Sequence, residues 1–295
     1  MDIWKVGIVR RSVKDILVKG FEGAGVQWLE EQRPFCFLAD PFGVWRKDNL
    51  AVFAEAYDYR SRLGRIDAFL LDRDLRLVER RTCLTEQWHL SYPFLFDMRG
   101  ELWMLPEAHR SGRLTLYRNH DFPFGWKPEM IIDVPEPAVD ATVTFHEGLW
   151  WLFYSPVGRP APTRLHAAFA ECIDGPWILH PANPLLVGDV GSRPGGTPFC
   201  SGEGLIVPAQ NSEGGYGSGI SMLTLAKLTP DIVELRIGAS LNSPVPRPFD
   251  AGLHTLSAAG DITLIDVKRN EQSLSRLPVD ALGRFRRAYR GWFQQ

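Results

Sequence analysis

Pairs of short apolar runs, each pair split by a polar turn and bracketed by polar residues, recur along the chain. In the first pair, ADPFGVWRKDNLAVFAE, Asp40 and Glu55 bracket two runs that RKDN separates. Later versions are SYPFLFDMRGELWMLPE, DATVTFHEGLWWLFYS, SRPGGTPFCSGEGLIVPAQ and GLHTLSAAGDITLIDVKR. Apolar runs of this length between turn residues are typical of β-strands. The pattern therefore predicts five β-hairpins.

The hairpins are evenly spaced. In the first three, the leading and trailing polar residues lie 15 positions apart, and successive hairpins begin 48 to 61 residues apart. This interval is the length of a four-stranded propeller blade. Runs between the hairpins, such as RIDAFLLDRDLRLVERR and GISMLTLAKLT, would supply the outer strands. We predict an all-β fold, a single five-bladed β-propeller over residues 1–275, in which the N-terminal run DIWKVGIVR closes the last blade.

The remaining residues, 276–295, have a different pattern. Leu282, Phe285 and Tyr289 follow a helix-like spacing, and five arginines lie among them. This predicts a short C-terminal helical extension packed on the propeller. Its positive face leaves weak contact with a membrane surface open as an alternative.

Composition supports a packed β-protein and excludes several functions. The chain is 45% hydrophobic and 12% aromatic, with 27 Gly and 22 Pro, too many turn formers for a helical fold. The formal net charge of −2 argues against nucleic acid as a partner. Without an 18-residue apolar stretch or a signal peptide pattern, we expect no transmembrane segment and a cytoplasmic location. The four cysteines lack metal-ligand spacing and are expected to be buried free thiols, and no metal or cofactor is expected.

The polar residues that bracket the hairpins predict a site on the propeller axis. Inner strands run roughly parallel to that axis, so equivalent positions of successive blades converge at one end. Folding does not require carboxylates there, because a buried charge is costly unless it is paired. Two alternatives remain open: Asp40-Pro41 is also a common turn signal, and Arg193 is also suited to a structural ion pair with one of the carboxylates. The residues expected to bind a substrate are Glu55, Trp88, His89, Tyr92, Arg193, Gln210, Tyr216, His254 and Asp266.

Carboxylates that face one another across a narrow channel suit acid and base chemistry. Crowding and burial raise the pKa of one carboxyl so that it can donate a proton, while another stays ionised. Glycoside hydrolysis uses such a pair. The residues expected to be catalytic are Asp40, Glu107 and Asp140.

The same runs carry a family resemblance. The five-unit pattern, with ADPFG first, PE closing the second hairpin and an Asp leading the third, resembles the five-bladed arabinanase-like and invertase-like glycosidases. A closer resemblance is to the propeller domain of plant glucosamine inositolphosphorylceramide transferases and uncharacterised bacterial proteins. FLADPFG, SYPFLF, WMLPE, DATVTFHEGLWWLFY, HPANPL, SRPGG, PAQ and GLHT look like that group's signatures, over about residues 35–270.

The resemblance suggests roles for single residues. Asp40 matches the first-blade acid, which acts as a base or nucleophile in the furanosidases, and Asp140 resembles the third acid position by placement. Glu107 would be the proton donor, although those enzymes usually have an Asp early in the second blade, where this chain has Tyr92. Arg193 and His254 resemble channel residues that hold substrate, or a central water or ion.

Three functions are compatible with these residues. The first is a carbohydrate-active enzyme of the glycoside hydrolase or transglycosylase type, which cleaves or transfers a glycosyl unit. The second is a non-catalytic module that binds a glycan or a nucleotide sugar. The third is an accessory transferase in surface-polysaccharide synthesis. In each case the expected partner is a carbohydrate or a sugar conjugate.

Overall fold

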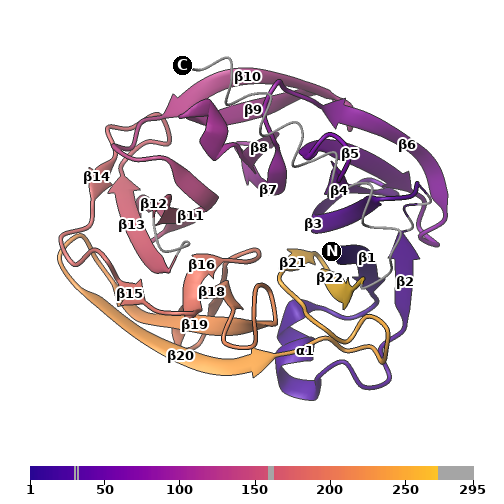
Figure 1. The fold of residues 1–295 in the computed structure, drawn as a ribbon. Helices are drawn as coiled ribbons and strands as arrows, with labels where there is room; N and C mark the ends of the chain where they lie inside the picture. Colours follow the sequence, from indigo (N-terminus) through magenta and orange to yellow (C-terminus); the bar gives the residue numbers. More distant parts are fainter. Residues whose placement is uncertain (30, 32, 159–162, 272–295) are drawn as a thin grey trace, which may run out of the picture.

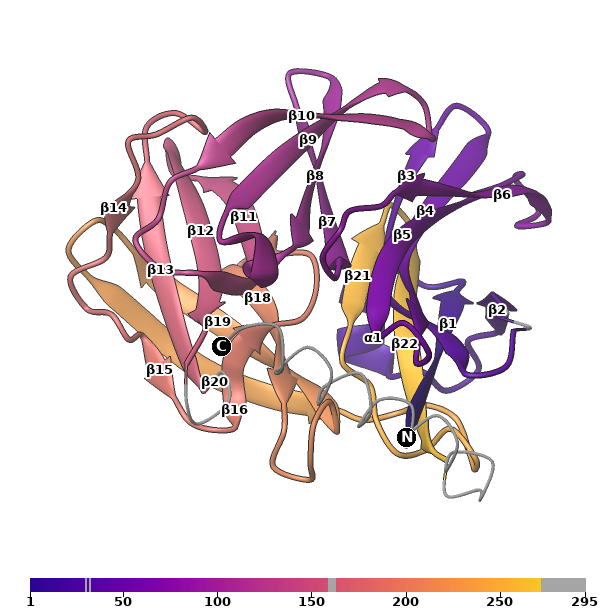
Figure 2. The ribbon, with the colours of Figure 1, turned by 45° about the horizontal axis from the view of Figure 1, so that its top comes forward.

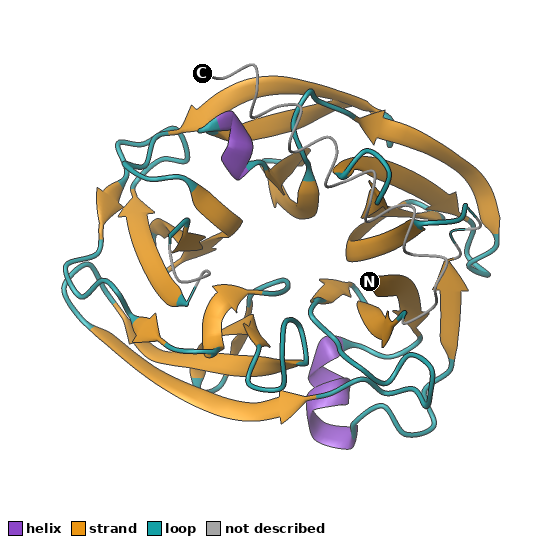
Figure 3. Ribbon diagram, in the orientation of Figure 1, coloured by secondary structure: helices purple, strands orange, loops and turns teal. Residues whose placement is uncertain are grey.

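Five β-sheets are arranged as blades around a central axis in the computed structural model, which describes residues 1–29, 31, 33–158 and 163–271 (Figure 1). The predicted five-bladed, all-β propeller is confirmed, with one short α-helix in addition (Figure 3). Residues 276–295, for which a helical extension is predicted, lie outside the described residues. Neither helix in the described part of the chain is long and apolar enough to cross a bilayer.

Blades 1 and 2 are regular antiparallel sheets whose strands follow chain order from the axis outward. A 3-10 turn, η1 (His109–Ser111), follows the second strand of blade 2. The strands of the two blades are β3 (Cys36–Arg46), β4 (Asn49–Asp58), β5 (Leu63–Leu71), β6 (Leu77–Leu84), β7 (Ser91–Met98), β8 (Glu101–Glu107), β9 (Leu114–Asp121) and β10 (Gly125–Ile132).

Blades 3 and 4 each carry an additional short strand. In blade 3 it pairs with the third strand, and in blade 4 it continues the inner strand beside the second strand. The strands of these blades are β11 (Ala138–His146), β12 (Leu149–Pro156), β13 (Arg164–Ala170), β14 (Ile178–Leu179), β15 (Leu186–Val187), β16 (Val190–Pro194), β17 (Phe199–Ser201), β18 (Gly204–Asn211), β19 (Gly219–Leu228) and β20 (Val233–Leu241).

Blade 5 contains both ends of the propeller sequence. Its two inner strands are β21 (Leu256–Ala259) and β22 (Ile262–Asn270), and its two outer strands are β1 (Asp2–Val9) and β2 (Val26–Leu29). β1 is antiparallel to β22, with Asp2 opposite Asn270. Figure 2 shows the two strands side by side near the N-terminus. This pairing closes the ring and leaves no open sheet edge between the last and first blades.

Helix α1 (Val13–Lys19) connects β1 to β2 and is not predicted by the sequence interpretation. Ser12 caps it, accepting a hydrogen bond from the backbone N–H of Asp15. The SVKD run carries this capping signal, a hydroxyl residue followed three positions later by an acid. Val13 and Ile16 are buried, and they pack against blade 5.

Apolar side chains fill the space between neighbouring blades. One cluster links blades 1 to 3 through residues such as Phe53, Trp103 and Leu152, and another links blades 3 and 4 through Trp151 and Leu205. Each large aromatic ring here is removed from water, which stabilises the ring of blades by a few kcal/mol per side chain. The aromatic excess of the sequence is thus largely used for packing.

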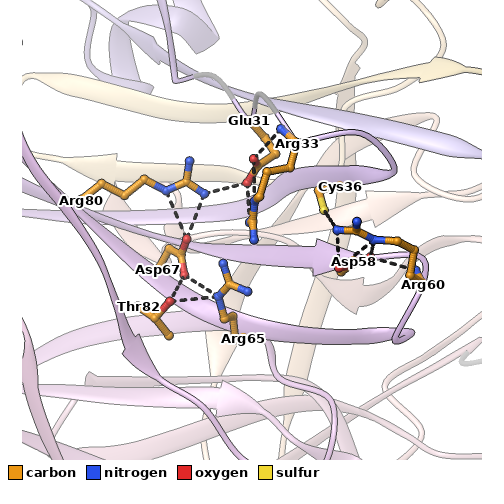
Figure 4. Close-up of polar contacts among 9 residues, drawn as sticks. All are labelled: Glu31, Arg33, Cys36, Asp58, Arg60, Arg65, Asp67, Arg80 and Thr82. Carbon is orange, nitrogen blue, oxygen red and sulfur yellow. Dashed lines mark hydrogen bonds and ion pairs between the residues drawn. The ribbon is translucent and has the colours of Figure 1, made fainter.

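Polar contacts add to this packing where blade 5 leads into blade 1. Figure 4 shows Glu31, just after β2, in contact with Arg33 and with Arg80 of β6, both at 2.7 Å. Arg80 also binds Asp67 of β5 at 2.9 Å, and Asp67 binds Arg65. Burial opposes ionisation of Glu31, but the two arginines outweigh it and lower its pKa to about 2. The network therefore stays charged over the physiological pH range and ties the blade junction together.

The prediction of four buried cysteines is wrong for two of them. Cys36 is buried and Cys83 is half-buried, but Cys172 and Cys200 are exposed, and all four are free thiols. The exposed pair lies in a turn after β13 and in β17, where short loops and hairpins leave side chains in solvent. Sequence spacing excludes a metal motif but carries no information about exposure in such turns.

The SRPGG run brings blade 4 against blade 5. Leu256 donates its backbone N–H to the Gly195 carbonyl at 2.8 Å, and Gly196 forms a parallel bridge with Leu256. A Cβ atom on Gly196 would collide with the Leu256 carbonyl oxygen and approach Pro208. Only glycine permits this approach of two backbones.

Gly196→Ala should therefore destabilise the protein by about 2–3 kcal/mol, because a buried backbone has to move to admit the methyl group. Urea unfolding monitored by tryptophan fluorescence measures this change. Gly202→Ala is the matched control, since nothing lies within 4 Å of the Cβ position in that blade 4 turn, and it should change stability by less than about 0.5 kcal/mol. Equal stability of the two variants would contradict the packing argument.

Candidate active site

The leading polar residues of blades 1 to 3 share an unusual backbone conformation. Asp40, Tyr92 and Asp140 have positive φ angles of 51°, 43° and 50°. In each blade the register between the first two strands shifts at this position. A left-handed residue at a β-bulge is costly, above all for Tyr, and such bulges commonly re-aim a side chain. The repeated bulge is the local cause of the convergence on the axis.

The predicted ring of polar residues forms across the blades. The leading residues lie on the first strand of each blade, or just before it in blade 5, and the trailing residues on the second strand. Residues far apart in sequence are in direct contact: Tyr92 donates its backbone N–H to Asp40 Oδ2 at 3.2 Å, and Asp40 donates its own to Asp266 Oδ2 at 2.9 Å. The structure thus brings blades 1, 2 and 5 together around these carboxylates.

Asp40 is buried in a dense set of hydrogen bonds. Thr255 Oγ1 donates to its Oδ1 atom at 3.1 Å, and His254 Nε2 lies 3.7 Å from the same oxygen. Burial raises the pKa of Asp40 to about 6. The nearby carboxylates of Asp140 and Asp266 also raise this pKa, whereas His254 lowers it. Asp40 can therefore change protonation state close to neutral pH.

Asp266 lies beneath His254 and orients it. It is fully buried and accepts the backbone N–H groups of Asp40, His254 and Thr255 at 2.9 to 3.1 Å. Its Oδ2 atom is 2.7 Å from His254 Nδ1, so that nitrogen carries the proton and Nε2 faces Asp40. Burial disfavours the His254 imidazolium, but Asp266 and Asp40 outweigh burial and raise its pKa. Asp266 is therefore a positioning residue rather than a direct contact for a ligand.

Asp140 pairs with Arg193 in a second polar cluster. Arg193 Nε is 2.5 Å from Asp140 Oδ2, and Gln210 Nε2 donates to the same oxygen at 2.9 Å. The structural ion pair left open by the sequence is therefore present. Burial nevertheless raises the pKa of Asp140, although Arg193 opposes this. Asp140 Oδ1 and Gln210 Oε1 are buried without a hydrogen-bond partner in the described structure.

Tyr92 closes the channel below these groups. It is fully buried, and its hydroxyl accepts the Gly196 N–H of blade 4 at 2.9 Å and contacts Thr142 Oγ1 of blade 3 at 2.9 Å. The side chain thus spans from blade 2 to two other blades. Tyr92 therefore forms part of the buried floor of the site.

A cavity of about 410 Å³ opens above this floor. Seven of the predicted site residues line it: Asp40, Glu55, His89, Glu107, Arg193, Tyr216 and His254. Five others do not: Trp88, which packs against the core, and Tyr92, Asp140, Gln210 and Asp266, which are buried around the floor. For these five, a direct contact with a ligand is not supported by the geometry.

The buried carboxyl group of Glu55 has no hydrogen-bond donor, among the described residues, that would stabilise its charge. Its residue is 6% exposed, and in the described structure no donor lies within hydrogen-bond distance of its carboxyl group. The nearest basic nitrogen, His89 Nε2, is 3.6 Å from Glu55 Oε1. His89 accepts the Gly64 N–H through Nδ1, and burial lowers its pKa to about 4, so it is neutral. Burial, Asp40 and Glu107 together hold the pKa of Glu55 well above its usual range.

Glu107, in contrast to Glu55, accepts several hydrogen bonds that favour its ionised form. His109 contacts its Oε1 atom through both the ring Nδ1, at 2.5 Å, and the backbone N–H, at 2.8 Å, and Ser91 Oγ donates to Oε2. Burial favours the neutral acid, but the hydrogen bonds from His109 outweigh it and lower the pKa of Glu107. The cavity therefore holds one carboxyl group whose pKa is raised by burial and one whose pKa is lowered by hydrogen bonds.

Aromatic rings form the wall on the blade 5 side. Trp4 stacks on His254 with centroids 3.7 Å apart, and Tyr216 contacts both rings edge-on. The Arg193 guanidinium lies 5.4 Å from the Tyr216 ring centroid. Tyr216, placed at the mouth by its Gly-rich loop, is 45% exposed and can contact a ligand.

The sequence interpretation missed several lining residues. Trp4, Tyr57, Tyr59 and His109 are not among the residues expected to bind a substrate, yet all four line the cavity. Tyr57 and His109 occur two positions after the trailing acids Glu55 and Glu107. Since alternate residues of a strand face the same side, this spacing is the signal that could have revealed them.

The described residues offer little for a metal ion. Ligand atoms of Asp40, His254 and Asp266 lie within 4.8 Å of one another. The Asp266 oxygens, however, are engaged by N–H groups, and His254 Nδ1 is bound to Asp266. Asp40 Oδ1 also accepts a hydrogen bond from Thr255, so among these three described side chains at most Asp40 and His254 Nε2 are available, fewer protein ligands than Zn²⁺ or Ca²⁺ sites normally have. The three side chains fit a hydrogen-bonded relay better than a metal centre.

The geometry can be compared with known proteins. A family model described as the N-terminal region of glucosamine inositolphosphorylceramide transferase 1 matches residues 25–244. The chain belongs to this family. It is 34% identical over 204 residues to glucosamine inositolphosphorylceramide transferase 1 of Oryza sativa subsp. indica, covering 67% of this chain. That match covers 27% of the rice protein, so the chain spans about a quarter of the length of the curated relatives it matches.

Solved structures with similar folds include glycoside hydrolases. Zg3597, a family 117 glycoside hydrolase from Zobellia galactanivorans, aligns with a TM-score of 0.56 at 16% identity, over 79% of this chain and 85% of that chain. An α-L-arabinofuranosidase from Lactobacillus brevis aligns with a TM-score of 0.58 at 14% identity, over 82% and 87%. At these identities, the similarity concerns the fold.

Proposed function

We propose that the chain is a carbohydrate-active enzyme that cleaves or transfers a glycosyl unit in the axial cavity. Glu55 donates a proton to the departing oxygen, and Asp40 is the base or nucleophile. Glu107 remains ionised and stabilises the positive charge that develops on the sugar ring. Asp140 and Asp266 position their neighbours without touching the substrate. This revises the expectation from the sequence that Glu107 is the proton donor.

The observation that carries this proposal is the contrast between Glu55 and Glu107. Both carboxyl groups line one cavity, but burial raises the pKa of Glu55, whereas the hydrogen bonds from His109 lower the pKa of Glu107. Carboxyl groups of one site whose environments push their pKa values apart are suited to different roles, here a proton donor and an ionised group that stabilises positive charge. A protonated acid beside ionised carboxylates is what glycosidic bond cleavage requires.

The relatives support the same class of chemistry. The curated family members are named glucosamine inositolphosphorylceramide transferase 1, and the structural neighbours include glycoside hydrolases. Both classes act on glycosidic bonds. The match covers only about a quarter of the length of these transferases. Transfer activity is therefore only proposed for this chain.

Activity on a panel of 4-nitrophenyl glycosides and oligosaccharides, with products separated by chromatography, tests the function. Asp40→Asn should lower kcat/KM at least about 100-fold on any substrate that is turned over, since it removes the base or nucleophile. Asp48→Asn, exposed in the turn of the same hairpin, is the matched control. Absence of any product, or equal rates for Asp40→Asn and wild type, would reject the enzyme proposal.

The pH dependence of kcat/KM gives an independent prediction. Asp40 acts when ionised, so activity should rise with pH through about pH 6, where its pKa lies. Glu55 acts when protonated, and its pKa is raised, so activity should fall only at higher pH, as that proton is lost. The profile should therefore be bell-shaped. A rate that keeps rising into the alkaline range would contradict the role of Glu55.

A second candidate is a non-catalytic glycan-binding module. It is favoured by the match to the N-terminal region of much longer transferases, whose remaining length has room for a separate catalytic domain. Calorimetry with the same sugars distinguishes the two: binding without product after prolonged incubation favours the module.

A further inference from the structure

His89 lies between β6 and β7, where blade 1 leads into blade 2, and its ring is held from several sides. The Gly64 backbone N–H donates to His89 Nδ1 at 2.8 Å, and the Leu90 backbone N–H donates to the Gly64 carbonyl at 3.1 Å. The Tyr57 ring packs edge-on against the imidazole, with centroids 5.8 Å apart. Leu90 is fully buried, and Trp88 packs against the core. The orientation of the imidazole is therefore set by the backbone and by packing.

The contact with Gly64 also determines which nitrogen of His89 carries the proton. A backbone N–H is a donor, so Nδ1 accepts through its lone pair and is not protonated. Burial lowers the pKa of His89 to about 4, so the ring is neutral and its one proton lies on Nε2. Nε2 is 3.6 Å from Glu55 Oε1. The ring thus presents an N–H group to the carboxyl group of Glu55.

Gly64 makes this close arrangement possible. A Cβ atom on Gly64 would collide with the Leu90 carbonyl oxygen, and it would lie 2.6 Å from Glu55 Oε1 and 2.9 Å from His89 Cε1. A larger residue would therefore displace the carboxyl group, the imidazole or both, because a packed interior has no room for the additional atom. A glycine occurs where the acid and the imidazole meet.

An ionised Glu55 would receive little stabilisation from the other groups of the cavity. Burial raises its pKa, and so do the carboxylates of Asp40, Glu107, Asp140 and Asp266. The phenols whose pKa values Glu55 raises in turn are Tyr57, Tyr59 and Tyr216. The other basic side chains that line the cavity are each bound to a different acid: Arg193 to Asp140, His109 to Glu107 and His254 to Asp266. Among the described residues, the N–H group directed at Glu55 is that of His89.

Proton transfer from Glu55 would strengthen this contact. In the proposed reaction, the Glu55 O–H bond breaks as its proton moves to the leaving oxygen, which also takes the electron pair of the glycosidic bond. Glu55 becomes a carboxylate, while His89 keeps its proton. At 3.6 Å the resting contact is longer than a hydrogen bond, and such contacts commonly shorten during the reaction. A charge-assisted hydrogen bond formed at that stage would stabilise the transition state more than the ground state.

We propose that His89 is a positioning residue that directs its Nε2–H group at Glu55 and stabilises the carboxylate formed when Glu55 protonates the leaving oxygen. This assignment rests on the proposed carbohydrate function and on the role of Glu55 in it. His89 neither gives nor takes a proton, and it acts on the acid rather than on the sugar. The water or alcohol that completes the reaction returns a proton to Glu55.

Two substitutions separate the roles of the two ring nitrogens. His89→Asn retains an acceptor near the Nδ1 position for the Gly64 N–H but removes the donor toward Glu55, whereas His89→Gln places an amide N–H near the Nε2 position. His89→Asn should lower kcat/KM on alkyl glycosides at least about tenfold and on 2,4-dinitrophenyl glycosides much less, since only the former need the acid. His89→Gln should recover part of the rate. His120→Asn, exposed on β9, is the matched control and should retain the wild-type rates.

The pH profile gives a readout that a purely structural role would not change. Without the N–H donor, the carboxylate of Glu55 is less stabilised and the pKa of Glu55 rises further. The alkaline limb of kcat/KM should therefore move to higher pH in His89→Asn and return toward its wild-type position in His89→Gln. Thermal unfolding establishes that each variant is folded.

Nitrogen-15 NMR of the imidazole rings tests the arrangement without any substrate. The signals of His89, identified by their absence in His89→Asn, should show a protonated Nε2 and an unprotonated Nδ1 at neutral pH. A protonated Nδ1, or an imidazolium ring, would overturn the assignment whatever the activity.

The outcomes distinguish this assignment from the proposed function. Unchanged rates in His89→Asn overturn the role of His89, and an equal loss on both leaving groups or a change in KM alone shows that His89 binds the sugar instead. Both results leave the carbohydrate function standing. Absence of turnover by a wild-type chain whose His89 shows the expected tautomer rejects the proposed function and with it this role.

Discussion

Replacing Glu55 by Gln lowers kcat/KM by about a thousandfold on glycosides with poor leaving groups, the expected loss for a general acid. Glu55 is buried, its pKa is raised well above the usual range and it lacks a hydrogen-bond donor in the described structure, so burial favours the acid form that can protonate the leaving oxygen. Substrates whose leaving group needs no protonation, such as 2,4-dinitrophenyl glycosides, should lose much less. Rates on matched alkyl and dinitrophenyl glycosides measure this difference. The alkaline limb of the pH profile should disappear in the same variant.

Glu101→Gln is the control for this experiment, because Glu101 is exposed at the opposite end of the strand that carries Glu107. It should retain the wild-type rates. An equal loss on both leaving groups in Glu55→Gln would mean that Glu55 binds the sugar rather than protonates the oxygen. Unchanged rates in the variant would exclude Glu55 from the chemistry.

Asp266→Ala should destabilise the fold by about 3–5 kcal/mol, as when one partner of a buried charged network is removed. The substitution leaves the backbone N–H groups of Asp40, His254 and Thr255 without an acceptor, together with the ring N–H of His254. None of these groups can reach water, because Asp266 is fully buried. Denaturant unfolding of wild type and variant gives the difference directly.

Asp261→Ala provides the comparison, since Asp261 lies exposed in the turn that joins β21 to β22, the strand that carries Asp266. Its effect should stay within about 0.5 kcal/mol. Asp266→Asn should be intermediate, because the amide retains one acceptor oxygen but loses the charge. Wild-type stability in Asp266→Ala would show that solvent or neighbouring side chains replace the carboxylate.

The regular spacing of the hairpins was enough to predict the propeller and the polar ring. A strand pair of fixed length places its bracketing residues at the same height in every blade, so the repeated interval from Asp40 to Glu55 and from Tyr92 to Glu107 implies convergence. The prediction held for Asp40 and His254, which come together from opposite ends of the chain.

The depth of each residue along the axis was not predictable in the same way. Tyr92 and Asp140 occupy leading positions like Asp40, yet only Asp40 lines the cavity. The difference arises from long-range contacts, such as the reach of Tyr92 to Gly196 and the pairing of Asp140 with Arg193. Periodicity describes one blade at a time, whereas these contacts depend on how blades face each other.

The pairing of β1 with β22, which closes the ring, also determines at which stage of synthesis the site can form. Residues 2–9 are synthesised long before residues 263–270, with which they pair, so strand β1 must wait until nearly the whole propeller has been synthesised. Asp40 likewise meets His254 and Asp266 only at that stage. Contacts of such sequence separation form slowly, because a long loop must close first. A nascent or truncated chain would carry Glu55 and Glu107, but the contacts of Asp40 with His254 and Asp266 would form only when the last blade is complete.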